Sequence, residues 1–315
     1  MKPPPESHLK IRNITFALEM PRIAIRCTAA VLPAAHAFQQ NIRRNIALGE
    51  LGARIAGWSS VNQHAENIAK VEAKLPLSPL AHTLTDPGGY VPVTPEYAEA
   101  YKRVWQRFGD DPHFTTDYIK QIGLYRLNVL IASNPALLEN GLGAVLQAMI
   151  LGAWTAFETL TGDLFDAALA NGPKEWKVPR AIARRRNFQS FKEIKLGYNE
   201  VFGDGSQSIF ARYPRLSMLK VVRNLYAHAG GKVNARFKSQ VSHDAAFSAA
   251  SLGSLLKLDG TVTKDLFECA ARCGADLLHM VDSRLADVLL PQPTKQEAEI
   301  LEQVRAATGV QGDER

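Results

Sequence analysis

The sequence predicts an all-α protein in which a four-helix bundle follows a helical N-terminal region. Three observations lead to this fold class. Apolar residues recur at spacings of three and four positions over most of the chain. Proline, glycine and capping residues bound these stretches as they bound helices. An apolar content of 46% over 315 residues is ordinary for a chain that buries a core.

Residues 1–142 form the expected N-terminal region, which carries no motif for a known chemistry. Helical patterns cover residues 34–74, 96–108 and 116–132. The proline- and glycine-rich stretch 75–95 is expected to be a loop. The third helical pattern places four apolar side chains on one stripe: Tyr118, Ile122, Tyr125 and Val129.

Residues 143–290 carry clearer signals and form the expected helical domain. Four helices are predicted to surround one core, at residues 143–170, 188–202, 214–228 and 263–290. The 214–228 helix is the best bounded, with Pro214 at its start and Gly230-Gly231 after its end. Thr263 is expected to cap the last helix, and the Gly203-Asp204-Gly205 segment is interpreted as a turn.

Residues 291–315 are expected to be a peripheral tail. The three cysteines form no paired disulfide framework or zinc-binding pattern, so a reducing cytoplasm is the expected compartment and no metal or cofactor is expected. No apolar run is interpreted as a membrane span, because charges or prolines interrupt each candidate. Arg26 and Pro33 likewise interrupt the apolar N-terminal stretch, so export is not expected.

Positive charge is concentrated in one region of the chain. Residues 173–240 contain fifteen Lys and Arg residues against four Asp and Glu, although the net charge of the whole chain is only +6. Such a region suits a polyanion, and a solvated helical face is an equally good explanation. Four arginines are candidates for tracking a nucleic-acid backbone: Arg180, Arg184, Arg185 and Arg186.

One short motif combines residue types that suit phosphate chemistry. Arg223-Asn224 is followed by His228 in the last turn of the 214–228 helix, and Lys220 lies one turn before Asn224. Arginine remains charged and donates two hydrogen bonds to a phosphate in a planar fork. Histidine titrates near neutrality and acts as either acid or base. Asn224 supplies an uncharged donor and acceptor.

This motif resembles the HEPN superfamily, whose catalytic members carry an Arg, a polar residue and, a few positions later, a His near a helix end. Upstream, Trp154 and Glu158 are similar to a Trp and Glu pair in the opening helix of one HEPN branch. The resemblance covers about residues 143–290. It implies a metal-independent ribonuclease that acts as a two-fold dimer, with RNA as its substrate and an antitoxin or other regulatory protein as a possible partner.

In that interpretation, His228 is a general acid or base, Arg223 stabilises charge on the phosphate, and Asn224 positions a phosphate oxygen or the histidine tautomer. Lys220 contributes to RNA binding. Glu158 is expected to hold Arg223, with a solvated helix-edge carboxylate as the alternative. Tyr226 is a candidate for stacking on a base, although core packing is the commoner role of such a tyrosine.

Two other functions remain open at this point. One is a non-catalytic HEPN module that binds nucleic acid or a protein. The other is a helical metal phosphohydrolase of the HD type, suggested by His228 and His243-Asp244 together with Asp265 or Asp276. Walker, Rossmann and nucleophile-elbow signatures are not found in the sequence.

Overall fold

The computed structural model describes residues 27–75, 94–133, 135–176 and 190–289. Within this part 79% of the residues are helical, and they form nine helices and no strand. The all-α prediction is therefore confirmed. The expected tail at 291–315 lies outside the described residues.

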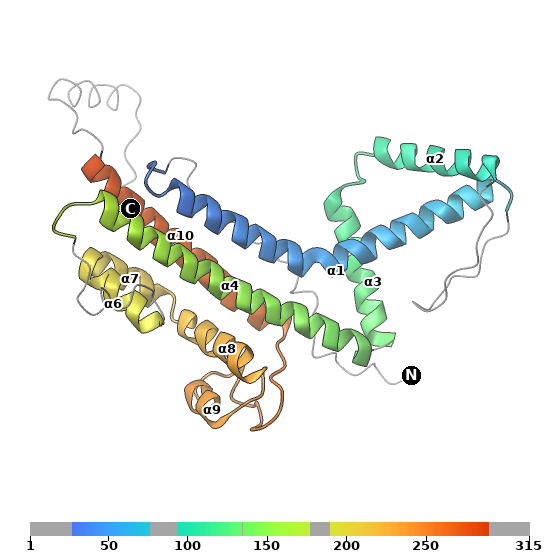
Figure 1. The fold of residues 1–315 in the computed structure, drawn as a ribbon. Coiled ribbons are helices and arrows are strands. Elements are labelled where there is room, and N and C mark those ends of the chain that lie inside the picture. Colours follow the sequence, from blue (N-terminus) through green and yellow to red (C-terminus); the bar gives the residue numbers. More distant parts are fainter. Residues whose placement is uncertain (1–26, 76–93, 134, 177–189, 290–315) are drawn as a thin grey trace, which may run out of the picture. The chain divides into compact units, whose positions relative to one another are not determined.

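The three helices expected in the N-terminal region are present with ends close to those predicted. They are α1 (Leu32–Glu72), α2 (Pro95–Asp110) and α3 (Thr116–Ser133) (Figure 1). The start of α2 follows from its residues, because Thr94 Oγ1 accepts a hydrogen bond from the Tyr97 amide at 3.2 Å and Pro95 occupies the first helical turn.

Six further helices follow along the chain. They are α4 (Pro135–Asn171), α6 (Phe191–Phe202), α7 (Asp204–Arg212), α8 (Arg215–Ala229), α9 (Ala235–Val241) and α10 (Gly260–Leu289). The expected domain boundary between residues 142 and 143 falls inside α4, which begins earlier than predicted. Gly203 ends α6 at a φ of 62°, but a new helix, α7, starts immediately where only a turn was expected.

The start of α10 also differs from the prediction. Asp259 is the capping residue instead of Thr263, because its Oδ1 accepts a hydrogen bond from the Val262 amide at 2.8 Å. The Thr263 hydroxyl donates to the Asp259 carbonyl at 2.8 Å and is buried in the helix. Aspartate caps a helix at least as well as threonine, so Asp259 starts the helix four residues before the predicted cap.

The described chain divides into two compact units. The first contains Asn41–Trp154 and Met218–Cys269, and the second contains residues 27–40, Thr155–Ser217 and residues 270–289. The four helices expected to form one bundle are divided between them, because α6 belongs to the second unit, most of α8 belongs to the first, and α4 and α10 contribute to both.

In the first unit, α3 packs closely against α1 through glycine. A Cβ atom on Gly123 would lie 1.7 Å from the Ala53 carbonyl oxygen, so the two backbones are in direct contact there. The buried Glu50 carboxylate adds ion pairs with Lys120 and Arg54, each at 2.7 Å. This contact is made by the face of α3 that carries Gly123. The apolar stripe from Tyr118 to Val129 lies on a different face of the helix.

That stripe is largely exposed to solvent. Tyr118, Tyr125 and Val129 are 51%, 70% and 42% exposed, whereas Ile119 and Leu127 on the adjoining face are buried. The helix itself was predicted correctly from its periodicity. The periodicity does not show which face of the helix is buried, because small residues that permit backbone contact give no hydrophobic signal.

The second unit has an aromatic core. Phe165 on α4 packs against Tyr198 and Phe202 on α6, with ring centroids 5.7 and 6.5 Å away. The buried Tyr198 hydroxyl donates a hydrogen bond to the Thr161 carbonyl at 2.8 Å, which satisfies its polar end. Phe210 on α7 extends the cluster, with its ring centroid 6.0 Å from that of Tyr198.

α4 is the most apolar helix of the described chain. Its residues Asn140–Asn171 are long and apolar enough, by length and composition, to cross a membrane. The sequence criterion therefore does not exclude a span by itself. Of its apolar window 39% is buried inside the protein, and Met149, Ile150 and Phe157 in this helix are fully buried. The helix is therefore partly buried, and the cytoplasmic location stays a prediction.

Candidate catalytic site on helix α8

α8 carries the Arg223, Asn224 and His228 motif and has two distinct faces. Leu219, Val222 and Leu225 are buried at 3% exposure or less and hold the helix on the first unit. Lys220, Asn224 and His228 recur every four residues on another face, where they are half-buried or exposed. Helical spacing thus aligns three of the predicted site residues along one solvent-facing row.

Arg223 adjoins this row and is held by its neighbour. Its Nη1 donates a hydrogen bond to Asn224 Oδ1 at 3.0 Å, and its side chain is half-buried. The bond occupies the amide oxygen, which leaves the Asn224 NH2 group as a donor beside the guanidinium. The pair therefore offers hydrogen-bond donors of the kind that phosphate oxygens accept.

His228 is exposed in the last turn of α8. The helix ends directly after it, because Gly230 and Gly231 adopt φ values of 56° and 80°. The predicted glycine stop is therefore confirmed. The imidazole thus lies at the C-terminal end of the helix.

Tyr226 anchors this helix end from the other side. Its hydroxyl donates to the Leu256 carbonyl at 2.7 Å, and a Cβ atom on Gly231 would lie 2.7 Å from its ring. Burial raises the pKa of Tyr226 well above its ordinary value, so the hydroxyl remains a donor. These contacts favour a structural role for Tyr226 over the base stacking considered from the sequence.

The chain after α8 pairs with a later segment and holds this end in place. The Leu256 amide donates to the Gly231 carbonyl at 2.9 Å, and the Val233 amide donates to the Ser254 carbonyl at 2.8 Å. α9 follows directly and lies beside the end of α8 (Figure 1). The sequence signal for α9 was weak because this helix has only seven residues.

Two further basic residues, Lys232 and Arg236, are exposed in the chain beyond the end of α8. Both lie in the basic region of the sequence, but no motif singled them out. From residue 218 to residue 240 the chain contains five Lys and Arg residues and no Asp or Glu. The surroundings of His228 along the chain are therefore basic, as an RNA-binding surface requires.

The described structure does not place the remaining predicted residues relative to this site. Arg180, Arg184, Arg185 and Arg186 lie outside the described residues. Glu158 is half-buried on α4 in the second unit, whereas Arg223 belongs to the first, so their pairing stays a prediction.

The residues that suggested a metal phosphohydrolase do not assemble into a metal-binding group. Over the described ranges, no three His, Cys, Asp or Glu side chains gather as metal ligands would. The described structure therefore gives no support to His228 and His243-Asp244 as ligands of a phosphohydrolase metal.

Comparison with known proteins gives no further guide to the site. No family model, curated protein or solved structure matches the chain. The functional interpretation therefore depends on the residues of α8 and their geometry.

Proposed function

We propose that the protein is a metal-independent endoribonuclease of the HEPN type. The observation that carries this proposal is the solvent-facing end of α8. There Arg223 Nη1 donates a hydrogen bond to Asn224 Oδ1 at 3.0 Å, and His228 is exposed one turn further on. A fixed cation and a titratable imidazole on one accessible helix end are the groups that RNA cleavage needs.

RNA supplies its own nucleophile in this reaction. The 2′-hydroxyl loses its proton to a base as its oxygen bonds to phosphorus, and the bond from phosphorus to the 5′-oxygen breaks. The departing 5′-oxygen then receives a proton from an acid. The products are a 2′,3′-cyclic phosphate and a 5′-hydroxyl. Water is not the nucleophile in this step.

Each chain supplies one imidazole at this site, whereas the reaction uses a base and an acid. A two-fold dimer brings two Arg223 and His228 pairs to one cleft, so that one histidine accepts a proton and the other donates one. Arg223 of either chain then stabilises the phosphate as negative charge develops on it. The dimer is thus part of the proposed mechanism.

Such an activity suits a toxin of a toxin–antitoxin pair, a phage-defence nuclease or an RNA-processing enzyme. In the first two settings an antitoxin or another regulatory protein restrains the nuclease. Lys220 and the arginines Arg184, Arg185 and Arg186 are proposed to bind the RNA backbone, so that replacing the three arginines weakens binding and flattens its salt dependence.

The test compares two exposed histidines of the same unit. His228→Ala is expected to lower the rate of RNA cleavage by about two to four orders of magnitude, the usual contribution of a positioned acid or base. His243→Ala is the matched control, since His243 is also exposed but lies outside the α8 row. Arg223→Ala is expected to lose a comparable amount, and Arg223→Lys to recover little, because lysine lacks the planar fork.

The same experiment separates the alternatives. Cleavage that survives His228→Ala but is lost in His243→Ala would contradict the proposal and return attention to a metal phosphohydrolase. RNA binding without cleavage by the unmodified protein would instead identify a non-catalytic module. A substrate with a single 2′-deoxy position provides the chemical control, because it lacks the attacking oxygen at that position and is expected to resist cleavage there.

A further inference from the structure

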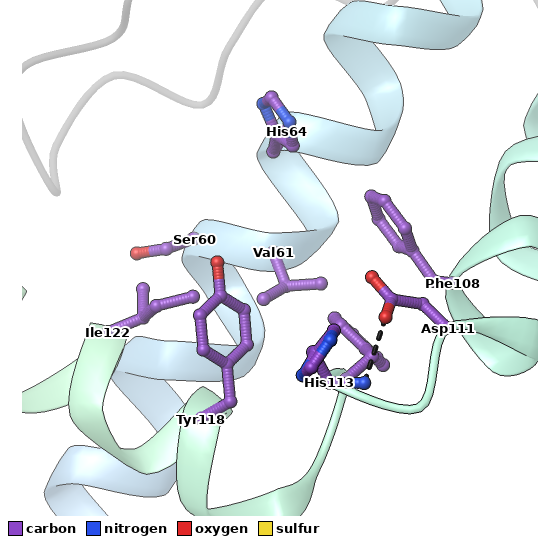
Figure 2. A pocket seen from close by; sticks show the side chains of 9 residues that line it. Ser60, Val61, His64, Phe108, Asp111, His113, Tyr118 and Ile122 are labelled. Atoms are coloured by element: carbon purple, nitrogen blue, oxygen red, sulfur yellow. Dashed lines mark hydrogen bonds between the residues drawn. The ribbon is translucent and has the colours of Figure 1, made fainter.

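The first unit contains a pocket whose lining residues, between Ser60 and Ile122, are distant in the sequence from the α8 motif. It has a volume of about 410 Å³ and is lined by residues of α1, α2, α3 and the turn between α2 and α3. Figure 2 shows Ser60, Val61 and His64 on α1, and Tyr118 and Ile122 on α3. Phe108, Asp111, His113 and Phe114 complete the lining. This volume suits a small organic molecule.

Aromatic rings make up much of the wall. Phe108 and Phe114 stack with ring centroids 5.0 Å apart, and Phe108 lies nearly parallel to the His64 ring at 6.2 Å. The Tyr118 ring lies 6.3 Å from that of Phe114. The side chain of Tyr118 is 51% exposed, so its ring remains accessible. The negative faces of such rings attract cations as well as apolar groups.

Asp111 is the only carboxylate among the nine residues that line the pocket, and none of the nine is Lys or Arg. Its Oδ1 accepts a hydrogen bond from the His113 amide at 2.8 Å, drawn as a dashed line in Figure 2. That bond fixes the carboxylate and leaves its second oxygen to accept from a ligand. The nearby Arg126 donates to Ser60 Oγ at 3.0 Å and to Gln63 Oε1 at 3.1 Å.

We propose that this pocket binds a small organic cation, an ammonium or amidinium group attached to an apolar or aromatic body. The cationic group lies against Asp111, and the body packs against Phe108, Phe114 and Tyr118. The nine lining residues include one carboxylate, two histidines and no Lys or Arg side chain, so the formal charge of the lining favours a cation over a phosphate-bearing ligand. The proposal is independent of RNA cleavage at α8.

Three probes that share a phenyl ring and differ in charge test cation binding by this pocket in the full-length protein. The probes are 2-phenylethylamine, the neutral 2-phenylethanol and the anionic phenylacetate, with binding measured by calorimetry and ligand-observed NMR. We expect the amine to bind at least about tenfold more tightly than the alcohol, as one charge-assisted contact allows, and phenylacetate to bind least. Equal affinities for the three probes, or no binding of the amine at millimolar concentration, would overturn the proposal.

Two neighbouring aspartates provide the matched variants. Asp111→Asn retains an oxygen that accepts from the His113 amide but loses the charge, so the preference for the amine over the alcohol is expected to disappear. Asp110→Asn removes the same charge one residue earlier, outside this lining, and is expected to preserve the preference. An equal loss in both variants would mean that general surface charge attracts the amine and would reject the site. Tyr118→Leu, at an exposed position, is expected to weaken amine binding without affecting the fold.

Discussion

At the scale of single residues, the candidate site depends on a contact between two neighbours in the sequence. Arg223 and Asn224 point from adjacent positions of α8, and the amide oxygen of Asn224 holds the guanidinium at 3.0 Å. An uncharged acceptor fixes the arginine without neutralising it. The charge thus remains available for a phosphate, which an aspartate at the same position would not allow.

Asn224→Asp tests this role directly. The variant keeps the oxygen that accepts from Arg223 but adds a negative charge that competes with phosphate, so kcat/KM for RNA is expected to fall about ten- to a hundredfold. Ser217→Asp, an exposed position two turns earlier on α8, adds the same charge as a control. Similar losses in the two variants would show that Asn224 has no special relation to Arg223.

At the scale of the helices, the sequence identified α8 best, because strong local signals bound it. A proline precedes its start, and two glycines with positive φ follow its end. Proline is common in the first turn of a helix and glycine just after its last turn, so both residues mark helix ends within a few positions. The ends of α8, and the place of His228 in its last turn, could therefore be predicted from the sequence.

Other elements could not be predicted because their causes are not local. The apolar stripe of α3 indicates a helix but not its buried face, because Gly123 allows a backbone contact with α1 that buries a different face. The division of α4 and α10 between two compact units likewise depends on packing over the whole chain. The contact of Tyr226 with the Leu256 carbonyl joins residues thirty positions apart, beyond any local pattern.

The end of α8 supports a stability prediction. Gly231→Ala is expected to reduce the free energy of unfolding by clearly more than Gly230→Ala, with the latter costing about 1 kcal/mol for a left-handed conformation. Both glycines have positive φ, but only at Gly231 would a Cβ atom meet the Tyr226 ring, at 2.7 Å. Urea unfolding followed by circular dichroism measures both. Equal losses would show that the ring contact does not fix this helix end.

At the scale of the whole molecule, the proposed RNA cleavage requires two copies of the chain at each active site. Light scattering at micromolar concentration is expected to find a dimer in active samples. Mixing an excess of His228→Ala chains with unmodified chains is expected to lower the activity of the unmodified protein, because a mixed dimer has only one of the two histidines that the reaction uses. A strictly monomeric active protein, or activity unchanged by mixing chains that exchange subunits, would contradict a shared site.

The chemistry of the RNA ends is the sharpest test of metal-independent cleavage through the RNA 2′-hydroxyl. Purified protein is incubated with a defined RNA in excess EDTA, and the termini of the products are identified by mass spectrometry and by their response to end-specific enzymes. Attack by the 2′-oxygen predicts 2′,3′-cyclic phosphate and 5′-hydroxyl ends in undiminished yield with the chelator. The His228→Ala protein is expected to form the same products at a rate lower by about two to four orders of magnitude. Loss of cleavage in EDTA, or products with 5′-phosphate ends, would contradict the account.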